Sequence, residues 1–245
     1  MESLRETRLL LKKGRRVLFT GTPCQIAAVR LLTRDAEGLV TADLICQAVP
    51  SPGLFRRYAD WLVRRHAAHA ITGFCFRDKS AEGWHRPALR ATFDNSRVYR
   101  RFYEDDPFTV AFASGLAVRP SCYACPFRAF PRPGDLTLGD FWGIERCHPE
   151  LDDNRGTSLA LIHTAKGADL FRSAGSTFAA TPVALAEGMA GNPCLSRSTA
   201  KESDRRDAFY RALNEELFER VVKRFLTPQR PFSLRAFARR LLKRS

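Results

Sequence analysis

The chain has 245 residues, of which 44% are hydrophobic and 27% charged, so it can bury a core and is unlike a disordered polymer. No apolar run reaches the length of a bilayer-spanning helix, and the charged start of the chain is unlike a signal peptide. We therefore expect a cytoplasmic protein. In that compartment seven cysteines indicate metal or redox chemistry rather than disulfides.

The formal net charge of +14 favours an anionic partner, such as nucleic acid, acidic lipid, a phosphorylated cofactor or an acidic protein. The alternative is a set of solvated arginine-rich faces without a partner. Nucleic acid is not expected, because the chain has neither a helix-turn-helix pattern nor a basic motif interleaved with aromatic residues.

The first fifth of the chain predicts a strand–helix–strand order. Residues 4–13 and 26–32 have helical patterns, whereas residues 17–20 and 39–45 are apolar and β-branched, as strands are. The turn at residues 21–25 lacks the glycine-rich fingerprint of a dinucleotide site. This order predicts an α/β fold with a mixed, partly parallel sheet.

A further helix, a β-rich insertion and two more strands follow. Ser51 as N-cap and Pro52 at the first helical position predict a helix start. Short apolar runs alternate with turn residues over 73–103, which indicates an inserted group of strands. Residues 135–138 and 158–163 predict two strands, each introduced by a turn.

The last third of the chain changes to helical patterns. A helical stripe is formed by Phe209, Leu213, Leu217, Phe218, Val221, Val222 and Phe225. Beyond two prolines, residues 234–244 predict a basic helix that suits an acidic membrane surface or an acidic partner. We therefore expect one domain over 1–180 and a basic helical C-terminal extension over 181–245, in a protein that is cytoplasmic or peripheral to a membrane.

The pair Cys122 and Cys125 gives the strongest local chemical signal. Two cysteines separated by two residues can direct both sulfurs at one metal centre, and Pro126 after them is typical of iron–sulfur sites. The same spacing also occurs in zinc sites, in redox dithiols and by coincidence.

Cys24 and Cys46 follow two successive predicted strands. Because the carboxyl ends of parallel strands meet at one edge of a sheet, we expect these thiols to be neighbours. Together with Cys122 and Cys125 they supply four thiolates, which suit either tetrahedral zinc or a cubane cluster. The remaining cysteines, Cys75, Cys147 and Cys194, are interpreted as residues that fill space.

The loop from Gly139 to Gly143 has two interpretations. Its glycines permit a close backbone approach, Phe141 or Trp142 can cover a planar ring, and Asp140 can accept a hydrogen bond from a ring nitrogen or a sugar hydroxyl. The alternative is a tight turn whose aromatic side chains lie in the core.

Four ordered motifs resemble the coenzyme F420 hydrogenase/dehydrogenase beta-subunit family. They read VLFTGTPCQIA at 17–27, DLICQAVPSP at 43–52, RPSCYACPF at 119–127 and GDLTLGDFWGI at 134–144. The second motif has Gln47 and Ala48 where the family usually has His-Gly. The resemblance covers about residues 14–166 and fades after about 180.

This resemblance implies a [4Fe-4S] cluster on Cys24, Cys46, Cys122 and Cys125, and a nearby flavin, normally FAD. The flavin-binding residues it implies are Gly21, Thr22, Pro23, Gln25, Gly139, Asp140, Phe141, Trp142 and Gly143. It further implies hydride exchange with F420 or another donor, single-electron transfer by the cluster and a redox partner protein; no catalytic residue is assigned. Relative to fuller members we expect an N-terminally truncated chain, without their ferredoxin-like cysteine motifs and with less of the flavin pocket.

Two alternatives remain open at this point. The first alternative is a non-enzymatic module whose four cysteines hold structural zinc or no metal, such as a scaffold in surface-polysaccharide synthesis. Cys24 as a catalytic nucleophile would need a paired histidine, and the sequence shows none beside it.

Overall fold

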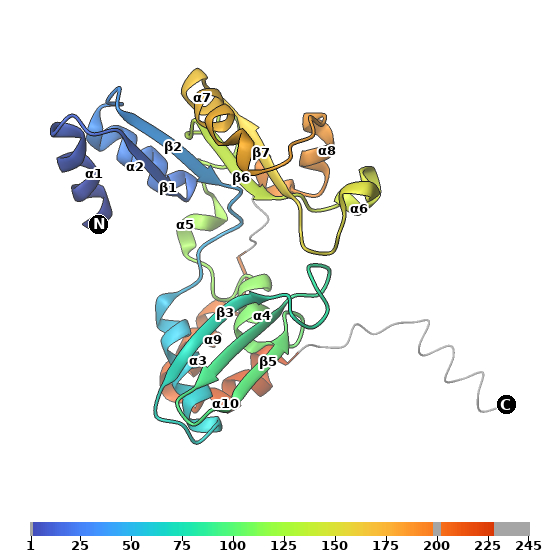
Figure 1. The fold of residues 1–245 in the computed structure, drawn as a ribbon. Helices are drawn as coiled ribbons and strands as arrows, with labels where there is room; N and C mark the ends of the chain where they lie inside the picture. The colour runs from blue at the N-terminus through green and yellow to red at the C-terminus, as the bar shows by residue number, and fades with distance from the viewer. Residues whose placement is uncertain (1, 198–201, 228–245) are drawn as a thin grey trace. The chain divides into compact units, whose positions relative to one another are not determined.

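The computed structural model describes residues 2–197 and 202–227, which form two compact units (Figure 1). Of the described residues, unit 1 holds 2–49, 83–85 and 118–197. Unit 2 holds 50–82, 86–117 and 202–227. The chain therefore passes between the units more than once. The division near residue 180 stays a prediction.

Unit 1 is built on a four-stranded mixed sheet in the order β1-β2-β6-β7. Strand β1 (Val17–Gly21) is parallel to β2 (Leu39–Leu44), and β2 is parallel to β6 (Leu136–Asp140). Strand β7 (Ser158–Ile162) runs antiparallel to β6 at the edge. The expected α/β class and partly parallel sheet are confirmed.

Short helices surround this sheet. They are α1 (Glu2–Lys12), α2 (Pro23–Thr33), α5 (Pro120–Tyr123), α6 (Ile144–Cys147), α7 (Ala165–Ala174) and α8 (Leu185–Ala190), with 3-10 turns η1 (Pro149–Leu151), η2 (Gly175–Thr177) and η3 (Pro193–Leu195). Helix α2 packs on β1 and β2, and α7 packs on β2. A side chain at Gly167 in α7 would collide with the carbonyl of Asp135, so this close approach of α7 to the sheet requires glycine.

Unit 2 contains the predicted β-rich insertion as an antiparallel sheet in the order β3-β4-β5. The strands are β3 (Ile71–Asp78), β4 (Ala88–Phe93) and β5 (Val98–Phe102). The helical elements are α3 (Pro52–Arg65), α4 (Pro107–Ala113), α9 (Arg206–Glu215), α10 (Phe218–Val221) and the π-helical turn η4 (Val222–Leu226). The Ser51 side chain accepts a hydrogen bond from the Leu54 amide, as the predicted N-cap requires.

One carboxylate organises the polar part of the unit 2 core. Asp106 is fully buried and accepts hydrogen bonds from the hydroxyls of Tyr58 and Tyr99, both at 2.7 Å. Its other oxygen accepts from the amides of Phe108 and Thr109 and so caps α4. Burial, followed by the Asp106 charge, raises the pKa of Tyr58 well above its usual range, so this phenol stays protonated.

The structure modifies the prediction for the C-terminal stripe. The predicted stripe breaks between α9 and α10, and Leu217 is 66% exposed at the break. The predicted basic helix over 234–244 lies outside the described residues. Among the helices that the structure describes, none has the length and hydropathy needed to cross a bilayer.

Candidate functional site

The carboxyl ends of β1, β2 and β6 lie at one edge of the unit 1 sheet (Figure 1). Strand β1 ends at Gly21 and β6 ends at Asp140. Cys46 lies two residues after the end of β2, where the Ile45 amide still donates to the Leu138 carbonyl at 2.8 Å. Both groups of predicted cofactor residues therefore start from the sheet edge that carries Cys46.

Cys24 is the most exposed thiol of the predicted set. It lies in the first turn of α2, and its Sγ is 3.2 Å from the Thr22 hydroxyl. The Gln25 side chain bends back to accept from the Thr22 amide at 2.9 Å, which fixes the turn between β1 and α2. The fold thus holds Cys24 at the sheet edge, open to solvent.

Burial and neighbouring cysteines both affect the pKa of the Cys46 thiol. Burial raises the pKa of Cys46 to about 11, and repulsion from Cys122, Cys24, Cys125 and Cys194 adds to the rise, in that order. Such repulsion requires that these thiols lie near Cys46 within unit 1. The Arg119 amide also donates to the Val49 carbonyl at 3.0 Å, so the segment that leads to Cys122 lies beside the segment that follows Cys46.

A buried arginine supports the loop that carries Cys122 and Cys125. Arg128 is 6% exposed, and its Nη2 donates to the Cys122 carbonyl at 2.7 Å. Its Nε donates to the Cys125 carbonyl at 3.1 Å. Its third nitrogen, Nη1, is buried without a hydrogen-bond partner among the described residues. The guanidinium thus fixes both cysteines and keeps one donor unused.

A second buried arginine connects this loop to the sheet. Arg132 Nη2 forms a buried ion pair with Asp43 at 2.6 Å and also donates to the Leu44 carbonyl at 2.9 Å. Its Nη1 donates to the Arg128 carbonyl at 2.6 Å. The position of the cysteine loop is therefore set by charged side chains that extend back to the carboxyl end of β2.

Thr137 on β6 completes the polar network. Its hydroxyl lies 2.7 Å from Asp43 Oδ1, 3.2 Å from Arg132 Nε and 2.8 Å from His163 Nε2. Since the carboxylate can only accept, Thr137 donates its one proton to Asp43, and Nε2 of His163 donates to Thr137. Burial lowers the pKa of His163, which favours the neutral ring with its proton on Nε2.

The arrangement of the thiols bears on which metal group they fit. Among residues 2–197 and 202–227, no group of three or more His, Cys, Asp or Glu side chains is placed so that it could hold a metal ion. Thiolates around tetrahedral zinc, with Zn–S of about 2.3 Å, stand only about 3.8 Å apart. A [4Fe-4S] cubane binds each thiolate through a different iron and so accepts wider spacing. Zinc and the cluster therefore differ in the sulfur spacing that they require.

The aromatic residues of the Gly139–Gly143 loop have different surroundings. Phe141 is 3% exposed and packs with Ile144 and Leu159 in a small core, as the alternative interpretation of the loop expected. Trp142 is 40% exposed and stacks on Trp84, with ring centroids 4.7 Å apart. Of Phe141 and Trp142, only Trp142 exposes its ring to solvent.

The glycines of this loop permit close contacts. An added Cβ at Gly139 would lie 2.5 Å from Ile45 Cδ1, so β6 approaches the residue before Cys46 closely. Gly143 has φ of +90°, a left-handed conformation that favours glycine. Both positions therefore serve the local fold, independently of any ligand.

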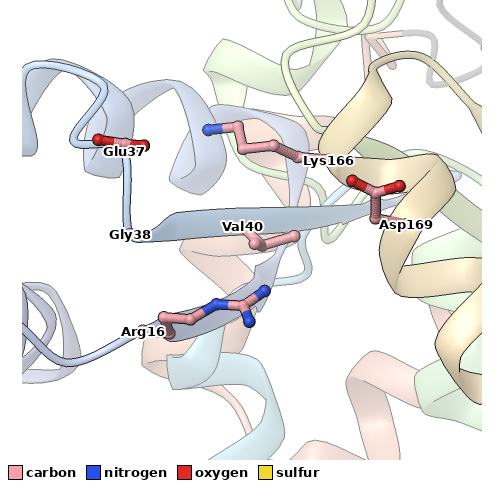
Figure 2. A pocket seen from close by; sticks show the side chains of 6 residues that line it. All are labelled: Arg16, Glu37, Gly38, Val40, Lys166 and Asp169. Carbon is pink, nitrogen blue, oxygen red and sulfur yellow. The ribbon is translucent and has the colours of Figure 1, made fainter.

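A cavity of about 400 Å³ lies at the opposite edge of the same sheet (Figure 2). It surrounds the start of β2 and is lined by Arg16, Glu37, Gly38, Val40, Lys166 and Asp169. The Lys166 Nζ donates to the Leu39 carbonyl at 2.8 Å. Sequence patterns do not predict this cavity, because its residues come from three separate segments without a motif.

The three cysteines set aside from the sequence have different positions. Cys75 is on β3 in unit 2, and the Cys147 thiol donates to the Gly143 carbonyl at 3.5 Å within α6. Cys194, in η3, is near enough to Cys46 for its charge to act there. No spacing in the sequence connects Cys194 to the other thiols, so pattern reasoning missed it.

The fold and the site define an α/β protein with cysteines gathered at the carboxyl edge of a mixed sheet. The model of the family described as the C-terminal part of the coenzyme F420 hydrogenase/dehydrogenase beta subunit matches residues 14–183, and the chain belongs to this family. The family is named for an oxidoreductase subunit, and the resemblance found in the sequence is confirmed. No curated protein matches the chain significantly.

Proposed function

We propose that this chain is an oxidoreductase subunit that passes electrons between a [4Fe-4S] cluster and a flavin. The cluster is held by Cys24, Cys46, Cys122 and Cys125. The observation that carries the proposal is that Cys24 and Cys46 follow two adjacent parallel strands at one edge of the sheet, in a chain of this family. When bound, the cluster supplies single-electron transfer and the flavin, FAD, supplies hydride exchange with F420 or another partner.

The protein's own contribution at the cluster is to hold and neutralise thiolates. Burial and like charges disfavour the Cys46 thiolate, so metal binding must release its proton. The Arg128 guanidinium brings positive charge to the carbonyls of Cys122 and Cys125. A buried cation in the loop of Cys122 and Cys125 favours negative charge there, which supports occupation of this site by an anionic cluster.

On the flavin side we assign binding to the two loops at the carboxyl edge. Gly21, Thr22, Pro23 and Gln25 form the turn after β1, and Gly139, Asp140, Phe141, Trp142 and Gly143 follow β6. Within the second loop, the exposed ring of Trp142 is the surface suited to a planar ring, whereas the buried Phe141 supports the loop from below. Sites in open α/β sheets gather at this edge.

The family name describes a beta subunit, which supports a redox partner protein as the physiological donor or acceptor. The net charge of +14 favours an acidic surface on that partner.

Anaerobic purification with iron, sulfide, zinc and flavin analysis tests the proposal. We expect about four irons and four sulfides per chain, with broad visible absorbance that bleaches on reduction. Cys122→Ala and Cys125→Ala should lose the iron, whereas Cys75→Ala, a thiol of unit 2, should keep it. Stoichiometric zinc in a colourless protein would instead support the structural module.

A further inference from the structure

Unpaired positive charge gathers around helices α1 and α2 of unit 1. The following exposed side chains form no ion pair with any described residue: Arg5, Arg8, Lys12, Lys13, Arg15, Arg16 and Arg34. Of the acids nearby in the sequence, Asp35 is already paired with Arg30 at 2.6 Å, which leaves Glu2, Glu6 and Glu37. Cations therefore outnumber acids here, and their charge attracts an anionic partner.

Exposed leucines lie on the same two helices. In α1 the inward side is marked by Thr7, which is buried, and Leu11, which is half-buried. Leu9 lies two residues from each, on the opposite side of the helix, and is 59% exposed. In α2 Val29 is fully buried, whereas Leu31 is 83% exposed. Leu10 and Leu32 are also exposed, at 37% and 38%. Exposed apolar side chains that are grouped rather than scattered mark an interaction site.

These features belong to one connected surface. Helix α1 packs on α2 and on β1, the edge strand of the sheet (Figure 1). An added Cβ at Gly38 would lie 3.4 Å from Leu11 Cδ2 and 3.2 Å from the Arg15 carbonyl, so the end of α1 lies against the start of β2. Arg16, which follows, lines the cavity beside that strand (Figure 2). We call the outward faces of α1 and α2, with the turn over residues 13–16, the α1–α2 surface.

The composition of the α1–α2 surface indicates which anionic partner it fits. Helices α1 and α2 read ESLRETRLLLK and PCQIAAVRLLT, and neither contains an aromatic residue. Binding of single-stranded nucleic acid uses aromatic side chains for stacking, and protein interfaces use tyrosine and tryptophan as anchors and are poor in lysine. Leucine mixed with lysine and arginine is instead typical of helices that lie at the surface of an anionic bilayer.

We propose that the α1–α2 surface binds anionic phospholipid at a membrane surface. The lysines and arginines contact the phosphate groups, and the leucines enter the boundary between head groups and acyl chains. This surface lies in unit 1 and is separate from the basic segment over 234–244. Helix α2 begins next to Cys24 at the carboxyl edge and ends at Thr33, so the bound membrane leaves the cysteine edge accessible. The binding does not depend on a cluster or a flavin.

Sedimentation of the full chain with lipid vesicles tests the proposal. One set of vesicles is phosphatidylcholine alone, and the other contains equal parts of phosphatidylcholine and phosphatidylglycerol. We expect binding to the mixed vesicles only, and added NaCl should weaken it, because salt screens exposed charges. Arg8→Gln with Lys12→Gln should weaken the binding about 25-fold, at about fivefold for each cation. Leu9→Ser with Leu31→Ser should weaken it about tenfold.

Matched pairs elsewhere in the chain control for general loss of charge or apolar surface. Arg56→Gln with Arg64→Gln removes two exposed cations of α3, and Arg239→Gln with Arg240→Gln removes two from the basic C-terminal segment. Leu185→Ser with Leu217→Ser removes two leucines that are 51% and 66% exposed. Each control pair should weaken the binding less than its α1–α2 counterpart, and circular dichroism checks that every variant is folded.

Several results would overturn the membrane role. These are no binding to the mixed vesicles, equal binding to both vesicles, or a control pair that weakens binding as much as its α1–α2 counterpart. Leucine variants that bind as well as the wild type would also overturn it, because charge alone would then hold the protein. Binding to a DNA duplex without binding to vesicles would assign the cations to nucleic acid instead.

Discussion

The two units bury their interiors in different ways. Unit 2 has a large apolar and aromatic core in which α3, α4, α9 and α10 cover the β3-β4-β5 sheet. Tyr58 is fully buried there, with the ring of Phe108 stacked 5.5 Å away. Unit 1 instead buries Asp43 and Arg132 as an ion pair with side chains 0% and 1% exposed. Apolar packing thus dominates the core of unit 2, and directional charged contacts hold the centre of unit 1.

This difference concerns function as well as stability. A buried ion pair stabilises a fold little more than apolar packing of the same volume would, because its charges must be removed from water. The Asp43–Arg132 pair, however, connects β2 to the Arg128 carbonyl and so to the loop of Cys122 and Cys125. In unit 1 the contacts that stabilise the fold also place the thiols, whereas unit 2 contains none of the predicted ligands.

The largest expected effect comes from breaking the buried pair. Asp43→Asn leaves the Arg132 charge without its carboxylate, and we expect a loss of about 3–5 kcal/mol in unfolding free energy, measured in urea. Iron content should fall with it, because the cysteine loop loses its support. Asp35→Asn is the matched control: its 2.6 Å pair with Arg30 is exposed and should contribute only about 0–1 kcal/mol. Equal losses in the two variants would contradict the comparison.

A substitution that creates a cavity in the unit 2 core should lower the stability of the protein without changing the cluster site. Leu54 is fully buried, and Leu54→Ala should cost about 2–5 kcal/mol in a urea titration. Iron bound per folded chain should stay at the wild-type value, because no thiol of the site is in unit 2. Leu217→Ala, at a position 66% exposed, should change stability by less than about 0.5 kcal/mol. Iron loss in Leu54→Ala as large as in Asp43→Asn would show that the units are not independent.

The sequence predicted the parts of this molecule that depend on local patterns. Strands β1 and β2 with the helix between them, the N-cap Ser51 and the β-rich insertion follow from hydrophobic periodicity and turn chemistry. The grouping of Cys24 and Cys46 at one sheet edge followed from parallel pairing.

The remaining features depend on contacts between residues far apart in the chain. No sequence pattern distinguishes the buried Arg128 and Arg132 from the other arginines. Arg132 pairs with Asp43, which lies 89 positions earlier in the chain. The segment of Asn192 is attached to the end of β6 by a hydrogen bond to the Asp140 carbonyl, 52 positions earlier. Leu217 matched the helical stripe but marks a break between two helices.

The smallest expected effect concerns Asp135, a second buried carboxylate of unit 1. Its contribution to the free energy of unfolding should depend on pH. Burial acts to raise the pKa of Asp135, but hydrogen bonds from Thr164 at 2.7 Å and from the amide and hydroxyl of Thr41, both at 2.8 Å, outweigh it and lower the pKa. A lowered pKa means that the carboxylate stabilises the fold above its unfolded value of about 3.9, and that this contribution is lost as pH falls through the lower folded value.

Asp135→Asn should therefore cost about 1.5–3 kcal/mol at neutral pH, by the loss of hydrogen bonds to a charged group. In urea titrations from pH 7 to pH 3 the difference from wild type should stay constant down to about pH 4 and shrink below it. Asp153→Asn, in an exposed turn, should change stability by less than about 0.5 kcal/mol at neutral pH. A difference for Asp135→Asn that stays unchanged through the acid range would mean that the charge of Asp135 does not stabilise the fold.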